Sequence, residues 1–165
     1  PDYVVVGVDP PAGSLRDECG IIVAGASGDG HARTAVVLDD RSLRARPERW
    51  ARTVADAAAD HDAEQVIAEA NQGGDMVRAV LHAAATGLPV KLVHASRGKR
   101  ARAEPIAALY AAGRVTHARR MPELEDQMCR FGGDGLQGSP DRVDALVWAL
   151  AGLMSPAAHP RMRLL

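Results

Sequence analysis

The chain has 165 residues, of which 47% are hydrophobic and 25% charged, and its formal net charge is −1. A chain of this size and composition can form one globular domain with a substantial core. Aromatic residues make up only 3% of the chain, which argues against binding nucleic-acid bases by stacking on aromatic side chains.

Three β-strands are predicted in the first 40 residues, at 3–9, 19–26 and 32–39. The first is nearly continuous in Val, and a turn signal at 27–30 (Ser-Gly-Asp-Gly) separates the second from the third. Strands that follow one another through such short connections pair in antiparallel fashion. The sequence therefore predicts an antiparallel meander at the start of the fold.

Helices and strands alternate in the next part of the chain. A helix over 47–60 begins with proline at its first position, and its apolar residues, including Trp50 as a core anchor, recur at helical spacing. Strands are predicted at 65–70 and 90–94, with a helix from residue 76 to 84 between them. This alternation is typical of parallel strands joined by helical crossovers.

The remainder of the chain predicts helices at 103–112, 121–130 and 140–154, with a flexible glycine-rich connection at 131–138. Trp148 in the last of these helices is interpreted as a core residue. The order of the elements predicts an α/β fold. It has a mixed five-stranded sheet, three antiparallel strands then two parallel ones, and helices on both faces.

The predicted domain covers residues 1–155, and residues 156–165 form a tail. Because the chain starts at Pro1 directly before a strand, we expect it to be a domain excised from a longer protein. Cys19 and Cys129 show neither zinc-ligand spacing nor a disulfide framework, which fits reduced cytoplasmic thiols. No apolar run approaches membrane-spanning length, and no signal peptide is visible, so a membrane partner is not expected.

Acidic residues follow hydrophobic segments that are far apart in the chain. Asp9 and Glu69 lie at the carboxyl ends of two predicted strands, where open α/β sheets tend to bind ligands. Asp141 and Asp144 are three residues apart and can share one face of the last helix. Burying an acid is costly unless its charge is compensated, so this pattern indicates carboxylates that converge on metal ions.

Divalent cations would remove the repulsion among such carboxylates, which is several kcal/mol per pair at about 4 Å. Oxygen ligands without cysteine or paired histidine favour Mg²⁺ or Mn²⁺. Two ions about 3.5–4 Å apart can activate water and stabilise the leaving oxygen of a phosphodiester. Neutralising Asp9 or Asp144 is then expected to leave the metal-free fold at least as stable, because repulsion falls.

Each acid also has a simpler interpretation. Asp9 precedes Pro10 and Pro11 and could begin a turn, and Asp141 could stabilise a helix through the helix dipole. Glu69 and Asp144 are harder to explain in this way. Glu69 would share the sheet face of a buried isoleucine, and Asp144 lies one turn further into its helix.

Four basic residues fall within six positions after the strand at 90–94. They are Arg97, Lys99, Arg100 and Arg102. This segment is either a solvated loop or a site that holds the phosphate backbone of DNA without reading its bases. The second interpretation gains support if the segment lies at the same sheet edge as the acids.

Four segments resemble the nuclease domain of the phage terminase large subunit, a family with a ribonuclease H-like fold. They are VVVGVDP (4–10), VIAEANQGG (66–74), SRGKRARAEP (96–105) and SPDRVDAL (139–146). The resemblance extends from Tyr3 to about Met154. It implies that Asp9, Glu69 and Asp144 are the metal-binding catalytic triad, and that Asp141 assists one of two Mg²⁺ or Mn²⁺ ions.

The function implied by this resemblance is cleavage of concatemeric viral DNA during genome packaging in the host cytoplasm. The implied partners are double-stranded DNA, an ATPase motor domain, the portal and the small terminase subunit. The motor is expected to be absent from this chain. Gly98-Lys99 lacks both the upstream glycines and the following hydroxyl residue of an ATP-binding loop.

Three other functions use a related fold. A Holliday-junction resolvase has the same acids and would act on branched DNA. A nucleotide-binding module of the actin and sugar-kinase kind needs glycine-rich phosphate loops in its hairpins, and Asp29-Gly30 is a poor substitute. A DNA-binding or scaffold domain without activity would not need the intact acids.

Overall fold

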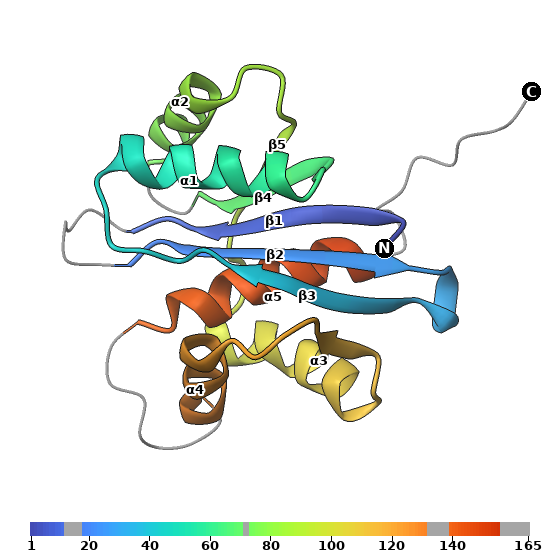
Figure 1. The fold of residues 1–165 in the computed structure, drawn as a ribbon. Coiled ribbons are helices and arrows are strands. Elements are labelled where there is room, and N and C mark those ends of the chain that lie inside the picture. The colour runs from blue at the N-terminus through green and yellow to red at the C-terminus, as the bar shows by residue number, and fades with distance from the viewer. Residues whose placement is uncertain (12–17, 71–72, 132–138, 156–165) are drawn as a thin grey trace, which may run out of the picture.

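The computed structural model describes residues 1–11, 18–70, 73–131 and 139–155. Its centre is a single six-stranded sheet with the strand order β5-β4-β1-β2-β3-β6 (Figure 1). The strands are β1 (Tyr3–Asp9), β2 (Gly20–Ser27), β3 (Thr34–Asp40), β4 (Gln65–Glu69), β5 (Val90–Val93) and β6 (Val115–His117).

The pairing of β1 to β5 is the predicted one. β1, β2 and β3 form an antiparallel meander, and β4 and β5 extend the sheet in parallel from β1. The predicted number of five strands is wrong, because β6 pairs in parallel with β3 at the other edge. With only three residues, β6 is too short to show the alternation that identifies a strand in a sequence.

Helices cover both faces of the sheet, as predicted. Figure 1 shows α1 (Pro47–Asp60) and α2 (Gly74–Ala84) on one face. The opposite face carries α3 (Lys99–Ala111), α4 (Pro122–Phe131) and α5 (Asp141–Met154). Within the described residues, no helix is both long enough and apolar enough to cross a membrane.

The start of α3 differs from the prediction. The helix begins at Lys99 rather than near residue 103, so Lys99, Arg100 and Arg102 belong to its first turns and not to a loop. Lysine and arginine have high helix propensities, and a run of them is compatible with either structure. The helical spacing matters for the site, because residues 99 and 102 can share one face of α3.

Each face of the sheet has its own hydrophobic core. Alternation along β1 sends Val4, Val6 and Val8 into the core beneath α1, together with the fully buried Trp50. Val5 lies in the second core, which the buried residues of α5 fill. The role predicted for Trp50 is therefore confirmed.

α5 packs very closely on β1 and β2 because two strand residues lack side chains. A Cβ atom at Gly7 would lie 2.2 Å from the backbone oxygen of Ala145. A Cβ atom at Gly20 would lie 2.0 Å from the backbone oxygen of Asp141. Glycine at both positions therefore allows the first turns of α5 to approach the end of β1, where Asp9 lies.

Three predicted features lie outside the described residues. They are part of the loop after β4 (71–72), most of the glycine-rich connection (132–138) and the tail (156–165).

Candidate active site

Asp9 and Glu69 end two adjacent parallel strands. Val8 of β1 is paired with Ala68 of β4, so the residues that follow them, Asp9 and Glu69, lie side by side at the carboxyl ends of these strands. We call this end of the sheet the acidic edge. Residues two apart on a strand share a face. Glu69 therefore points to the same face as Ile67, which belongs to the core beneath α5.

The amino-terminal turns of α5 bring Asp141 and Asp144 to the same edge. The Asp144 side chain is buried, and that of Asp141 is partly buried. The pKa of Asp9 is raised to about 8, mainly by burial and then by the charges of Asp144, Glu69 and Asp141, in that order of importance. These shared effects show that the four predicted acids face one region of the molecule.

Two basic residues of α3 lie among these acids. Lys99 Nζ is 2.5 Å from Asp144 Oδ2. Arg102 donates a 3.2 Å hydrogen bond from Nη2 to Asp144 Oδ1, and its Nη1 is 3.8 Å from Glu69 Oε2. Burial alone would lower the pKa of Lys99, but the hydrogen bond and charge of Asp144 raise it overall. Lys99 and Arg102 therefore supply much of the positive charge that the buried acids require.

The four predicted basic residues divide into two groups. Lys99, whose side chain is 46% exposed, and the mostly buried Arg102 pair with the acids, whereas Arg97 and Arg100 are exposed to solvent. An exposed pair beside the acidic edge is free to meet a large anionic ligand. Lys99 and Arg102 already balance charge within the protein.

Trp148 is a site residue whose role sequence reasoning missed. It packs against the core, as predicted, but its Nε1–H also donates a 2.6 Å hydrogen bond to Glu69 Oε2. The Arg102 guanidinium carbon lies 4.7 Å from the centre of the Trp148 ring, within the range of a cation–π interaction. Trp148 thus holds both Glu69 and Arg102. The spacing of four residues between Asp144 and Trp148 could have indicated this role from the sequence, because it places both side chains on one face of the helix.

The residues present fit a divalent cation by their chemistry. Asp9, Glu69, Asp141 and Asp144 offer only carboxylate oxygens, which suit Mg²⁺ or Mn²⁺. Burial is the largest cause of the raised pKa of Asp9, and the charges of Asp144, Glu69 and Asp141 add to it more than Lys99 offsets. Within the described ranges, however, no three acidic, histidine or cysteine side chains are arranged as a finished metal site. A cation bound to Asp144 Oδ2 would compete with Lys99, which is paired with that oxygen.

The strand order, the closely packed α5 and the acids at the strand ends define a ribonuclease H-like domain. The chain belongs to the terminase RNase H-like domain family, whose model matches residues 6–153. This match confirms the resemblance found in the sequence. No match was found among the curated proteins.

Solved structures support the same fold. The large terminase nuclease of the thermophilic phage G20c, solved with bound zinc, is 16% identical, with a TM-score of 0.68, and the match covers 90% of this chain and 80% of that one. The nuclease domain of the bacteriophage SPP1 large terminase, solved with bound Mn, is 15% identical, with a TM-score of 0.57 and coverages of 90% and 85%. RuvC of Thermus thermophilus is 18% identical, with a TM-score of 0.56 and coverages of 91% and 92%.

Proposed function

We propose that this domain is a divalent-metal-dependent endonuclease that cuts concatemeric viral DNA during genome packaging. The observation that carries the proposal is the convergence of Asp9, Glu69, Asp141 and Asp144 on one sheet edge, where the pKa of Asp9 is raised to about 8. Membership of the terminase family and the metals bound in two related nuclease structures support the same activity.

In this proposal, Asp9, Glu69 and Asp144 hold the metal ions, and Asp141 assists one of them. Two Mg²⁺ or Mn²⁺ ions supply activation of water and stabilisation of the leaving oxygen. Trp148 orients the Glu69 carboxylate through its hydrogen bond. Lys99 and Arg102 balance the acidic charge, and Lys99, whose side chain is about half exposed, would also be placed to contact a DNA phosphate.

The proposed partners follow from this role. They are double-stranded DNA, an ATPase motor domain, the portal and the small terminase subunit, and the proposed location is the host cytoplasm. The exposed Arg97 and Arg100 lie beside the acidic edge and would contact the DNA backbone, not its bases.

Incubation with supercoiled plasmid tests the activity directly. We expect nicked and linear products with Mg²⁺ or Mn²⁺, none with chelator, and none from Asp9→Asn. Absence of metal-stimulated cleavage under all conditions would contradict the proposal. A four-way junction in the same panel tests the resolvase alternative, since RuvC shares this fold. Preference for the junction over linear duplex would favour that alternative.

Removing the two exposed arginines should weaken DNA binding by reducing phosphate contacts. For Arg97→Gln with Arg100→Gln, we expect the plot of log affinity against log salt to become less steep, by about 0.9 for each lost duplex phosphate contact. Fluorescence anisotropy with a labelled duplex at several salt concentrations measures this slope. Arg49→Gln with Arg52→Gln is a matched control, because these exposed arginines lie on α1 across the sheet. An equal slope in both double variants would exclude Arg97 and Arg100 from the interface.

A further inference from the structure

Arg142 lies between Asp141 and Asp144 in the sequence but makes a separate set of contacts. It donates two hydrogen bonds to Glu18, from Nε to Oε2 at 3.0 Å and from Nη2 to Oε1 at 2.8 Å. Its remaining nitrogen, Nη1, donates to Asp40 Oδ2 at 2.5 Å. The guanidinium therefore joins α5 to two carboxylates that come from different parts of the chain.

These contacts are shielded from water. The side chains of Arg142, Glu18 and Asp40 are 15%, 18% and 6% exposed. Ion pairs of this kind, with a two-point fork on one carboxylate, fix geometry as well as charge. Burial would lower the pKa of Arg142, but the charges of Asp40 and Glu18 raise it overall.

The carboxylates that hold Arg142 come from residues at the end of the sheet. Glu18 directly precedes Cys19, which forms a β-bridge with Leu43, and Asp40 is the last residue of β3. The other carboxylate oxygen of Asp40 accepts the backbone N–H of Ser42 at 3.0 Å.

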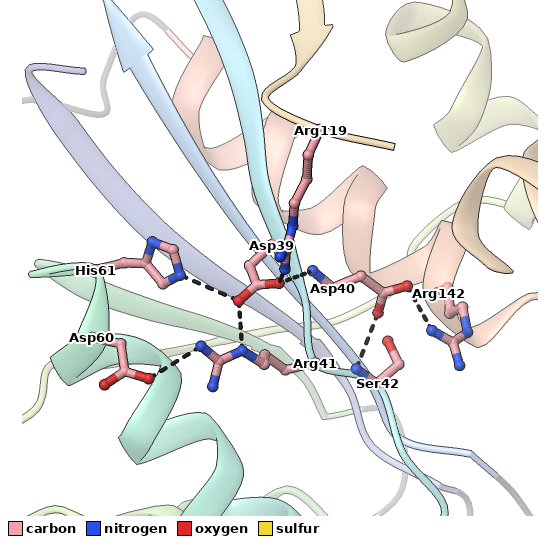
Figure 2. Close-up of polar contacts among 8 residues, drawn as sticks. All are labelled: Asp39, Asp40, Arg41, Ser42, Asp60, His61, Arg119 and Arg142. Atoms are coloured by element: carbon pink, nitrogen blue, oxygen red, sulfur yellow. Dashed lines mark hydrogen bonds and ion pairs between the residues drawn. The ribbon is translucent and has the colours of Figure 1, made fainter. Parts of the chain in front are cut away.

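The neighbouring Asp39 anchors the same end of β3 from its other side, as Figure 2 shows. The partners of the buried Asp39 carboxylate come from three parts of the chain, namely Arg41, His61 and Arg119. Arg41 also reaches Asp60 at the end of α1, with a distance of 3.1 Å. The end of β3 is thus fixed on both faces, and Arg142 ties α5 to it.

Apart from Arg142, the charged anchor of the first turns of α5 is Asp144, which pairs with Lys99 and Arg102 of α3 and so, among the described residues, makes no ion pair with the sheet. Pro140 occupies the amino-terminal cap position of α5, where no side-chain hydrogen bond caps the helix. The backbone N–H of Val143 donates a neutral 2.9 Å hydrogen bond to Gln127 of α4. Gly20 lets α5 approach the sheet, and the three bonds of Arg142 add directed contacts that tie the first turn of the helix to Glu18 and Asp40.

We propose that Arg142 is a positioning residue for the acidic site. By fixing the first turn of α5 against Glu18 and Asp40, it sets where Asp141 and Asp144 lie relative to Asp9. The inference rests on the proposed function, because it assumes that these acids bind metal. Arg142 itself touches neither metal nor DNA in this account.

Removing Arg142 has two effects on metal binding, one through its charge and one through the placement of Asp141 and Asp144. Because the two effects are opposite in sign, a variant can distinguish them. Removing a positive charge near four acids should strengthen cation binding if only Coulombic attraction matters. Losing the correct placement of Asp141 and Asp144 should weaken it. Mutation of residues that orient metal ligands typically costs about 10–100-fold in metal affinity.

The test uses Arg142→Gln, with two measurements. Isothermal titration calorimetry should show Mn²⁺ binding weakened about tenfold or more. Hydrogen exchange of the metal-free protein should show that backbone amides in the first turns of α5 have lost protection. Unchanged or tighter Mn²⁺ binding would overturn the proposal, as would unchanged exchange.

If Arg142→Gln does not fold, Arg142→Lys takes its place, because it keeps the charge but not the two-point contact of the guanidinium with Glu18. The same weakening and exchange are expected, and wild-type behaviour would overturn the proposal.

Arg41→Gln is the matched control. It removes an arginine from the same end of β3, and its contacts are with Asp39 and Asp60 instead of α5. We expect it to lower stability and leave Mn²⁺ affinity unchanged. Equal weakening in both variants would assign the effect to general destabilisation and overturn the proposal. If the wild-type protein bound no Mn²⁺, the proposed function would fail. The exchange experiment would still show whether Arg142 fixes α5.

Discussion

Asp144→Asn is expected to abolish DNA cleavage. A metal ligand contributes several kcal/mol to stabilisation of the transition state, which corresponds to a loss of about 10³-fold or more in rate. Single-turnover nicking of plasmid at saturating Mn²⁺ measures this loss. Cleavage within about tenfold of wild type, which is about 1.4 kcal/mol, would contradict a catalytic role for Asp144.

The same variant should also lose stability, because Asp144 is the partner of two cations. Its side chain is only 3% exposed, and it pairs with Lys99 and with the mostly buried Arg102. Breaking a buried pair from one side costs about 3 kcal/mol. Asp9→Asn is the matched control. It should lose cleavage equally and yet keep or gain stability, because burial and the charges of Asp144, Glu69 and Asp141 all disfavour an ionised Asp9. Urea unfolding of both metal-free variants measures the difference, and equal changes in stability would contradict this account.

The stability of the metal-free protein should fall as pH rises, because of Asp9. Its pKa is raised from 3.8 to about 8 by burial and by Asp144, Glu69 and Asp141. Between these values the folded state binds a proton that the unfolded state has released, so ionisation favours unfolding. The free energy of unfolding falls by up to about 1.4 kcal/mol per pH unit inside this window, and the total fall is several kcal/mol.

Comparison with Asp9→Asn isolates this effect from other titrating groups. Asp141 also has a raised pKa and acts in the same direction, whereas the lowered pKa of Asp39 acts below about pH 4. The stability of Asp9→Asn minus that of wild type should therefore grow from pH 4 to pH 8. A constant difference across this range would show that Asp9 ionises normally. Metal should bind more tightly at higher pH, because it displaces the proton.

Local sequence patterns predicted the parts of the molecule that depend on local physics. The Val-rich β1 and the β4 strand that ends at Glu69 are identifiable because buried strands are apolar throughout. Their parallel pairing then brings Asp9 and Glu69 to one edge, which general rules for α/β sheets also predict. The acids on α5 follow from helical spacing alone.

Contacts between distant segments could not be predicted in this way. The hydrogen bond from Trp148 to Glu69 joins residues 79 positions apart, and that from Arg142 to Glu18 joins residues 124 apart. No local pattern shows which side chain an arginine or tryptophan will meet. The structure also changes one expectation. From the sequence alone, neutralising Asp9 and neutralising Asp144 are expected to have the same effect on the stability of the metal-free fold. In the structure, Asp144 pairs with Lys99 and Arg102, so its charge is expected to stabilise the fold.

Anomalous diffraction from a crystal soaked in Mn²⁺ would show whether the four acids hold a metal ion. We expect Mn²⁺ bound by carboxylate oxygens of Asp9 and Asp144, with Glu69 or Asp141 completing the site and Lys99 displaced from Asp144. Manganese found only elsewhere on the protein, with Lys99 still paired to Asp144, would contradict this expectation.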